Sequence, residues 1–252
     1  MTAHLWSENA EGWARDIRDG LDIINDRFGL PFFVSQLPDL NGKCILDAGC
    51  GEGRSTRAIV QRGSTVIGAD ISSTMLEIAE REESENPKGI RYINASCHAL
   101  DSIKSNSIDV ITSYMSLMDM PDIDQAISEF SRTLKSQGEI FIMVRHPCFF
   151  TPGFSIFKTN SENRAGLTIS RYFESENYID KFRFGGPSSN EFKMLRFPYT
   201  LSKYIESLIN FGFTIRNLQE PRPTEMLCAT HPRLVFWRKQ AACFLFLHAK
   251  LN

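Results

Sequence analysis

The sequence predicts a doubly wound α/β fold built on a mostly parallel seven-stranded sheet. Between about residues 42 and 145, short runs rich in Ile and Val alternate with helix-like segments, which is typical of βαβ units. The chain has 252 residues, of which 42% are hydrophobic, so it can bury one sizeable core. We therefore expect a single domain over residues 1–252, with additions to the alternating core.

Five apolar runs predict the first strands, at residues 44–47, 65–69, 91–93, 108–112 and 139–144. We expect helices to fill the gaps between them. Hydroxyl side chains after Asp70 predict a helix through about Arg81, and a second helix begins at Asp122 and stops before residues 136–138. A helix at 201–210 and strands at 212–218 and 242–250 bring the expected number of strands to seven.

Two segments lie outside this alternation. The first forty residues carry Trp6, Trp13, Ile17, Leu21 and Ile24 at spacings of an amphipathic helix laid over the sheet. Residues 148–200 are rich in Phe and Tyr, and an alternating run at 181–184 precedes a turn-like run at 185–190, which predicts an inserted antiparallel hairpin. These aromatic side chains either form a satellite core or line an acceptor pocket.

Charge and composition exclude several classes of protein. The formal net charge is -2, which argues against nucleic acid as a partner. No basic segment followed by an apolar one opens the chain, so we expect a cytoplasmic location. The apolar run at 243–247 falls short of the roughly 20 residues that a bilayer requires, so no membrane contact is expected. The six cysteines form no C-x-x-C pair, which predicts reduced thiols and no metal site.

The most informative stretch is residues 45–56, in which a strand runs into a glycine-rich turn (residues 49–53) and then into a helix. Its glycines stand at positions 49, 51 and 53, where they allow positive φ and close approach of a ligand to the backbone. A dinucleotide site requires a third glycine where Arg54 stands, which weakens a nicotinamide oxidoreductase interpretation. Asp47 would repel a pyrophosphate, but it suits a cationic amino group.

Asp70 stands 19 residues after Gly51, at the end of the second predicted strand. A carboxylate in this position can accept hydrogen bonds from two ribose hydroxyls. A surface aspartate or an ordinary turn would explain each feature alone, but the two features together favour a ligand that contains a ribose.

Asp47 followed by three alternating glycines resembles the motif of the class I S-adenosylmethionine-dependent methyltransferases, and the resemblance covers about residues 40–147. It implies the Rossmann-like methyltransferase fold, with S-adenosylmethionine as cofactor and S-adenosylhomocysteine as product. The division that follows is an N-terminal helical cap (1–40), a cofactor-binding core (41–147), an aromatic-rich insertion (148–200) and C-terminal strands (201–252).

The resemblance also implies which residues bind the cofactor. The residues assigned in this way are Asp47, Gly49, Cys50, Gly51, Asp70, Ile71, Ser96, Cys97, Ser113 and Met118. In the family, the adenine loop usually carries an Asp followed by Ala, whereas Ser96 and Cys97 stand there in this chain. A hydroxyl or the backbone at Cys97 would have to replace the usual contact with adenine.

His146 is the candidate general base, because it follows the fifth strand at the carboxyl edge of the sheet, where ligands of open α/β folds bind. The alternative is a histidine bonded to a loop carbonyl. The candidate acceptor pocket consists of Trp6, Tyr114, Arg145 and Tyr199, together with Arg196. Each of these side chains could instead be structural.

The predicted activity is methyl transfer to a small-molecule acceptor, by a monomer or a homodimer, and mainly through proximity and alignment. No Asn-Pro-Pro-Tyr or Asp-Pro-Pro-Tyr run follows the fourth strand, which argues against amino groups of macromolecules as acceptors. Two alternatives stay open. One is an RNA or protein methyltransferase with a basic groove, formed by Arg216, Arg222, Arg233, Arg238 and Lys239. The other is a non-catalytic protein that binds S-adenosylmethionine.

Overall fold

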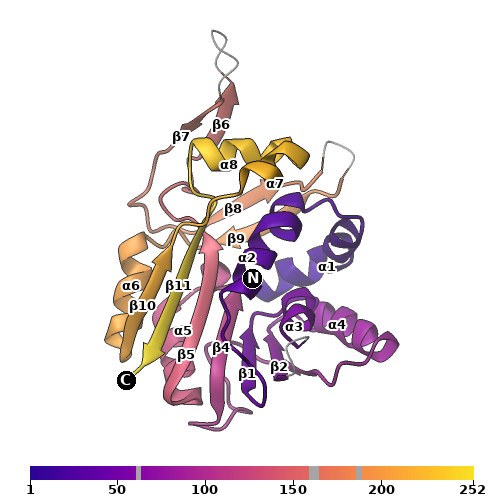
Figure 1. Cartoon of the computed structure of the whole chain (residues 1–252), viewed down its shortest axis with the longest axis vertical. Coiled ribbons are helices and arrows are strands. Elements are labelled where there is room, and N and C mark those ends of the chain that lie inside the picture. The colour runs from indigo at the N-terminus through magenta and orange to yellow at the C-terminus, as the bar shows by residue number, and fades with distance from the viewer. Residues whose placement is uncertain (61–63, 159–164, 186–188) are drawn as a thin grey trace.

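A computed structural model describes residues 1–60, 64–158, 165–185 and 189–252. Its core is one seven-stranded sheet in the order β10-β11-β5-β4-β1-β2-β3 (Figure 1). The strands are β1 (Cys44–Ala48), β2 (Thr65–Asp70), β3 (Arg91–Asn94), β4 (Ile108–Tyr114), β5 (Leu134–Arg145), β10 (Phe213–Gln219) and β11 (Phe244–Leu251). β11 pairs antiparallel with both of its neighbours, and the other pairings in this sheet are parallel. The predicted fold class is therefore confirmed.

Side-chain caps explain where three of the flanking helices begin. The helices around the sheet are α3 (Arg54–Val60), α4 (Ser73–Glu85), α5 (Ile123–Thr133) and α6 (Leu201–Asn210). Ser72 accepts a hydrogen bond from the backbone of Met75 at the start of α4, and Asp122 accepts one from Gln125 at the start of α5. Both starts agree with the expected boundaries, and α6 spans the predicted residues 201–210.

The expectation of a helix in every gap is wrong between β3 and β4. Residues 95–107 form turns there. Side chains of α5, and not helical hydrogen bonds within the segment, bond to some of its backbone groups. Arg132 donates to the carbonyls of Leu100 and Ile103 at 3.0 and 3.1 Å, while Glu129 accepts from the amide of Leu100 at 2.8 Å.

The N-terminal cap consists of α1 (Thr2–Arg18), a π-helical turn η1 (Asn25–Gly29) and α2 (Leu30–Ser35). Gly20, with a φ of +69°, lies just beyond α1, so the predicted single helix does not continue through Leu21 and Ile24. α1 also packs on α4 rather than directly on the sheet. Its buried Ala10 and Ala14 contact Met75 and Ile78, where small side chains allow close helix approach.

The aromatic-rich insertion contains two antiparallel strand pairs. The predicted hairpin is confirmed as β8 (Tyr178–Phe182) and β9 (Phe192–Arg196), although residues 186–188 of its expected turn lie outside the described residues. A second pair, β6 (Ser155–Lys158) and β7 (Ala165–Thr168), was not predicted. Trp13 of α1 lies edge-on to Phe184 and Phe192 at ring-centroid distances of 4.7 and 5.3 Å.

A third covering segment lies between β10 and β11. It consists of α7 (Glu225–Thr230), a 3-10 turn η3 (Pro232–Leu234) and α8 (Val235–Lys239). Figure 1 shows α7 and α8 near β8, at the end of the sheet where the parallel strands terminate. Three segments distant in sequence therefore cover the carboxyl ends of the strands. Among the described helices, none combines the length and the apolar character needed to cross a membrane.

Candidate functional site

A cavity of about 540 Å³ lies at the carboxyl ends of the parallel strands. The turn after β1, the end of β2 and the segment after β4 contribute to its wall, and α1 and α8 contribute from above. The strand order reverses between β1 and β4. Open α/β sheets bind ligands at this kind of reversal, because the loops on either side of it diverge and leave a crevice.

The glycine-rich turn approaches the segment after β4 very closely. Gly49 adopts a φ of +76°, and a Cβ atom added there would lie 2.4 Å from the Cβ of Ser116. The Ser116 hydroxyl in turn donates to the carbonyl of Ala48 at 2.7 Å. Gly51 adopts a φ of +55° and has open space where its Cβ would be, so a ligand can reach its backbone.

Asp47 lies in the protein interior next to the glycine-rich turn and does not face the cavity. It has no exposed surface, and its carboxylate accepts hydrogen bonds from Ser55, Thr56 and Thr112 at 2.7 to 2.9 Å. Burial raises the pKa of Asp47, against the opposing effect of these hydroxyls. The expected direct contact with a cationic amino group is therefore not supported. Ser113 is also fully buried, and neither residue lines the cavity.

Asp70 lies at the cavity wall, where it bonds to the glycine-rich turn after β1 and to the segment between β2 and α4. Its carboxylate oxygens accept from the amides of Gly51 and Ser72 at 2.8 and 2.9 Å. Burial raises the pKa of Asp70, while these backbone hydrogen bonds lower it. The predicted residues Cys50, Ile71, Ser96, Cys97 and Met118 also line the cavity. The structure thus brings most of the predicted cofactor residues together.

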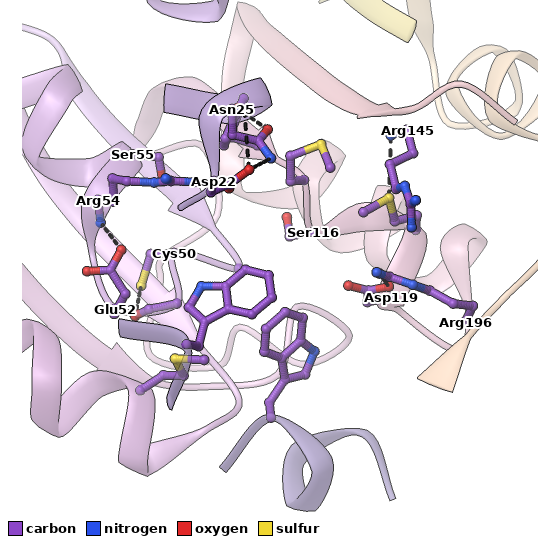
Figure 2. A pocket seen from close by; sticks show the side chains of 18 of the residues that line it. Asp22, Asn25, Cys50, Glu52, Arg54, Ser55, Ser116, Asp119, Arg145 and Arg196 are labelled. Atoms are coloured by element: carbon purple, nitrogen blue, oxygen red, sulfur yellow. Dashed lines mark hydrogen bonds and ion pairs between the residues drawn. The ribbon is translucent and has the colours of Figure 1, made fainter. Parts of the chain in front are cut away.

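A charged cluster on the N-terminal side completes this end of the cavity, and the sequence analysis missed it. Arg54 donates to Asp22 at 3.2 Å and also to Asp26, while Tyr114 donates to Asn25 at 2.6 Å. Figure 2 shows Arg54, Asp22 and Asn25 on the same side of the cavity. The two aspartates stand four residues apart, a helical spacing that could have indicated a shared face.

Two arginines lie at the opposite end (Figure 2). Arg196 pairs with Asp119, and both it and Arg145 donate to Asp180, at 3.4 and 3.1 Å respectively. The guanidinium of Arg145 lies 4.0 Å from the ring centroid of Phe150. Of the predicted acceptor-pocket residues, Trp6, Tyr114 and Arg145 line the cavity together with Arg196.

Tyr199 does not line this cavity. It lines a second, much smaller one, where its hydroxyl donates to the carbonyl of Met120 at 2.8 Å. The hydroxyl is used in a structural hydrogen bond, and burial raises its pKa to about 12. The geometry therefore supports the structural alternative for Tyr199.

The geometry does not favour His146 as a base. Its side chain is 2% exposed and lines neither cavity. Its Nε2 lies 2.7 Å from Glu220 Oε1, and its Nδ1 accepts a hydrogen bond from the amide of Cys148 at 3.2 Å. With Nδ1 as acceptor, the proton sits on Nε2 and is donated to Glu220. Both ring nitrogens are therefore engaged away from the cavity.

The burial of His146 predicts a pH effect on stability. Burial lowers its pKa below the ordinary value of 6.5, although Glu220 opposes this shift. As the pH falls below about 6.5, the unfolded chain binds a proton that the folded chain does not, so the free energy of unfolding decreases. Urea titrations from about pH 7.5 to about pH 5.5 should show a shallower decline for His146→Gln than for the wild type. Equal declines would contradict this assignment.

The fold is that of an open α/β protein with a glycine-rich turn beside the point where the strand order reverses, and comparisons with known proteins show what it resembles. A family model described as a methyltransferase domain matches residues 46–142. Ubiquinone biosynthesis O-methyltransferase of Pseudomonas fluorescens is 31% identical over 109 residues, which are 43% of this chain and 47% of that protein. The chain therefore spans about half the length of the curated relatives that it matches first.

Solved structures share the fold over most of the chain. An S-adenosylmethionine-dependent methyltransferase from Mesorhizobium loti has a TM-score of 0.70 and 24% identity, over 87% of this chain and 96% of its own. A Listeria monocytogenes protein assigned to the same class has a TM-score of 0.72 and 24% identity, over 92% and 99% of the two chains. Residues 46–142 thus match a methyltransferase domain, and most of the chain shares the fold of these S-adenosylmethionine-dependent methyltransferases.

Proposed function

We propose that this chain transfers a methyl group from S-adenosylmethionine to a small-molecule acceptor and releases S-adenosylhomocysteine. The observation that carries the proposal is the hydrogen bond between Asp70 and the backbone of Gly51 in the glycine-rich turn. Both residues lie in the matched domain, beside the point where the strand order reverses. The curated relative is named as an O-methyltransferase of ubiquinone biosynthesis, which supports a small acceptor.

In this proposal the cofactor lies along the ends of β1, β2 and β3. The open backbone at Gly51 faces the methionine part, Asp70 accepts from the ribose hydroxyls, and Ser96 with Cys97 lies beside the adenine. Asp70 is suited to the ribose because its two oxygens are already oriented by backbone amides. Fixed acceptors of this kind lose little entropy when the ligand binds.

Methyl transfer from a sulfonium is an in-line displacement, in which the acceptor atom attacks the methyl carbon and the thioether leaves. Alignment at near-attack distance supplies much of the rate enhancement. The acceptor then occupies the half of the cavity near the ends of β4 and β5, where Met118 and Arg145 line the wall. A base role for His146 stays a prediction that its position does not favour.

Thermal unfolding with S-adenosylhomocysteine tests the cofactor site. At 100 times its dissociation constant, a ligand stabilises by about 2.7 kcal/mol, or roughly 5–10 °C for a chain of this size. We expect this shift for the wild type and its loss in Asp70→Ala, because the ribose hydroxyls lose their acceptor. Glu83→Ala is a matched control, since Glu83 also accepts from backbone amides but does not line the cavity.

The outcomes separate the competing interpretations. A wild-type shift that Glu83→Ala keeps and Asp70→Ala loses supports the site. A shift without methyl transfer to any member of a panel of hydroxylated and amino acceptors would favour the non-catalytic alternative. The absence of any shift with either S-adenosylmethionine or S-adenosylhomocysteine would overturn the proposed function.

A further inference from the structure

The charged side chains of the cavity are divided between its two ends. Three acidic residues, Asp22, Glu52 and Asp70, lie with Arg54 at the end of the glycine-rich turn. Arg145 and Arg196 lie with Asp119 at the other end (Figure 2). S-adenosylmethionine carries a sulfonium and an ammonium against one carboxylate, so the end with more acidic than basic side chains suits the cofactor. The arginine end faces the space that the proposed function leaves for the acceptor.

Arg145 is only partly neutralised by its neighbours. One of its nitrogens, Nη1, donates to Asp180, which it shares with Arg196. Its other guanidinium N–H groups have no hydrogen-bond partner among the described residues, although the side chain lines the cavity. Burial and the nearby Arg196 both lower the pKa of Arg145. The guanidinium is therefore a partly buried cation with donors left for a ligand.

The other charged groups at this end already have partners, although Asp119 Oδ2 is buried without a hydrogen bond to any described residue. The carboxylate of Asp119 is the acidic group there that lines the cavity, and Arg196 binds one of its oxygens. Arg183 also lines the cavity, but it is bonded to the carbonyl of Ser189 and to Glu191. Within the described part of the chain, Arg145 retains the clearest capacity for a new anionic partner.

A second arginine lines the same cavity from the segment between β10 and β11. Arg233 lines the cavity, is exposed, and has no ion pair or hydrogen bond with any described residue. Arg233 belongs to η3, and Trp237 of the following helix α8 also lines the cavity. The Trp237 ring stacks on Phe150 at a centroid distance of 5.1 Å, and Phe150 is the ring beneath Arg145.

We propose that the methyl acceptor carries an oxyanion, which Arg145 and Arg233 bind while Phe150 and Trp237 contact its apolar part. This inference rests on the proposed function for the position of the acceptor. Guanidinium groups bind carboxylates and phosphates through paired N–H donors, and charge-assisted hydrogen bonds are stronger than neutral ones. An oxyanion would also compensate the charge of the partly buried Arg145 guanidinium.

Isothermal titration of the protein saturated with S-adenosylhomocysteine tests this inference with benzoate, phenyl phosphate and the neutral benzamide as probes. We expect at least one anionic probe to bind about ten times more tightly than benzamide, because hydrogen bonds to charged groups are worth more than neutral ones. Benzoate and phenyl phosphate distinguish a carboxylate acceptor from a phosphorylated one. Arg233→Gln and Arg145→Gln should each reduce the preference to about that of the neutral probe.

Lys181→Gln is the matched control, because Lys181 is an exposed cation of β8 that does not line the cavity. It should retain the preference, while Arg233→Gln, whose exposed side chain can change without disturbing the core, should lose it. S-adenosylhomocysteine should bind all variants equally. The inference would be overturned if the anionic and neutral probes bound equally, or if either arginine variant kept the preference. Weaker nucleoside binding in Arg233→Gln would also overturn it. Failure of the nucleoside to bind the wild type would instead overturn the proposed function.

Discussion

Replacing Gly49 with alanine is expected to abolish binding of S-adenosylhomocysteine and to lower the free energy of unfolding by about 3 kcal/mol. The residue has a φ of +76°, where a Cβ atom costs about 1 kcal/mol or more. The new Cβ would also lie 2.4 Å from the Cβ of Ser116, and overpacking of this kind costs typically 1–3 kcal/mol. Relief of the clash must move the turn away from the cavity. Urea unfolding and calorimetric titration measure the two effects.

Gly42→Ala is a control that shows how much of the effect of Gly49→Ala comes from backbone strain and how much from the clash with Ser116. Gly42 has a φ of +69°, and a Cβ atom added there meets no heavy atom within 4 Å. We expect this variant to lose about 1 kcal/mol and to bind the nucleoside as the wild type does. If Gly49→Ala were no less stable than Gly42→Ala and still bound the nucleoside, the close approach to Ser116 would not shape the site.

The elements that the sequence could predict are those whose signals are local. β1 and β2 are short apolar runs that end in the glycine-rich turn and in Asp70, so strand, turn and carboxylate could be read together. The helix at 201–210 follows from its apolar spacing and the capping hydroxyl of Thr200. The cofactor end of the site could also be predicted from local sequence, because Gly51 of the turn and Asp70 lie only 19 residues apart.

The features that were missed depend on contacts between distant segments. The ring of His146 bonds to Glu220, which lies 74 residues further along the chain, and no local pattern indicates that pairing. Residues 95–107 hold their turns through Arg132 and Glu129 of α5 instead of through helical hydrogen bonds. Likewise, the three hydroxyls that surround Asp47 come from two different elements, so its enclosure could not be inferred from the motif itself.

Removal of the Arg54 side chain is expected to destabilise the fold by about 3 kcal/mol and to weaken binding of S-adenosylhomocysteine. Arg54 stands one residue after the glycine-rich turn and pairs with Asp22 and Asp26 of the N-terminal cap. The Asp22 side chain is only 4% exposed, so Arg54→Ala leaves a nearly buried carboxylate without its cation. The loss should be visible in urea unfolding, and the nucleoside affinity should fall because Asp22 and Asn25 line the cavity.

Arg18→Ala provides the comparison, because Arg18 also joins the cap to the core, through Glu82, but with side chains that are 45% and 30% exposed. Exposed pairs contribute about 0–1 kcal/mol, so this variant should be nearly as stable as the wild type and should bind the nucleoside normally. A double-mutant cycle of Arg54→Ala with Asp22→Asn then isolates the buried pair. Restored stability and affinity in the double variant would mean that the uncompensated charge displaces the cap. Additive losses would mean that the cap is held by its apolar contacts, and that the pair does not couple it to the glycine-rich turn.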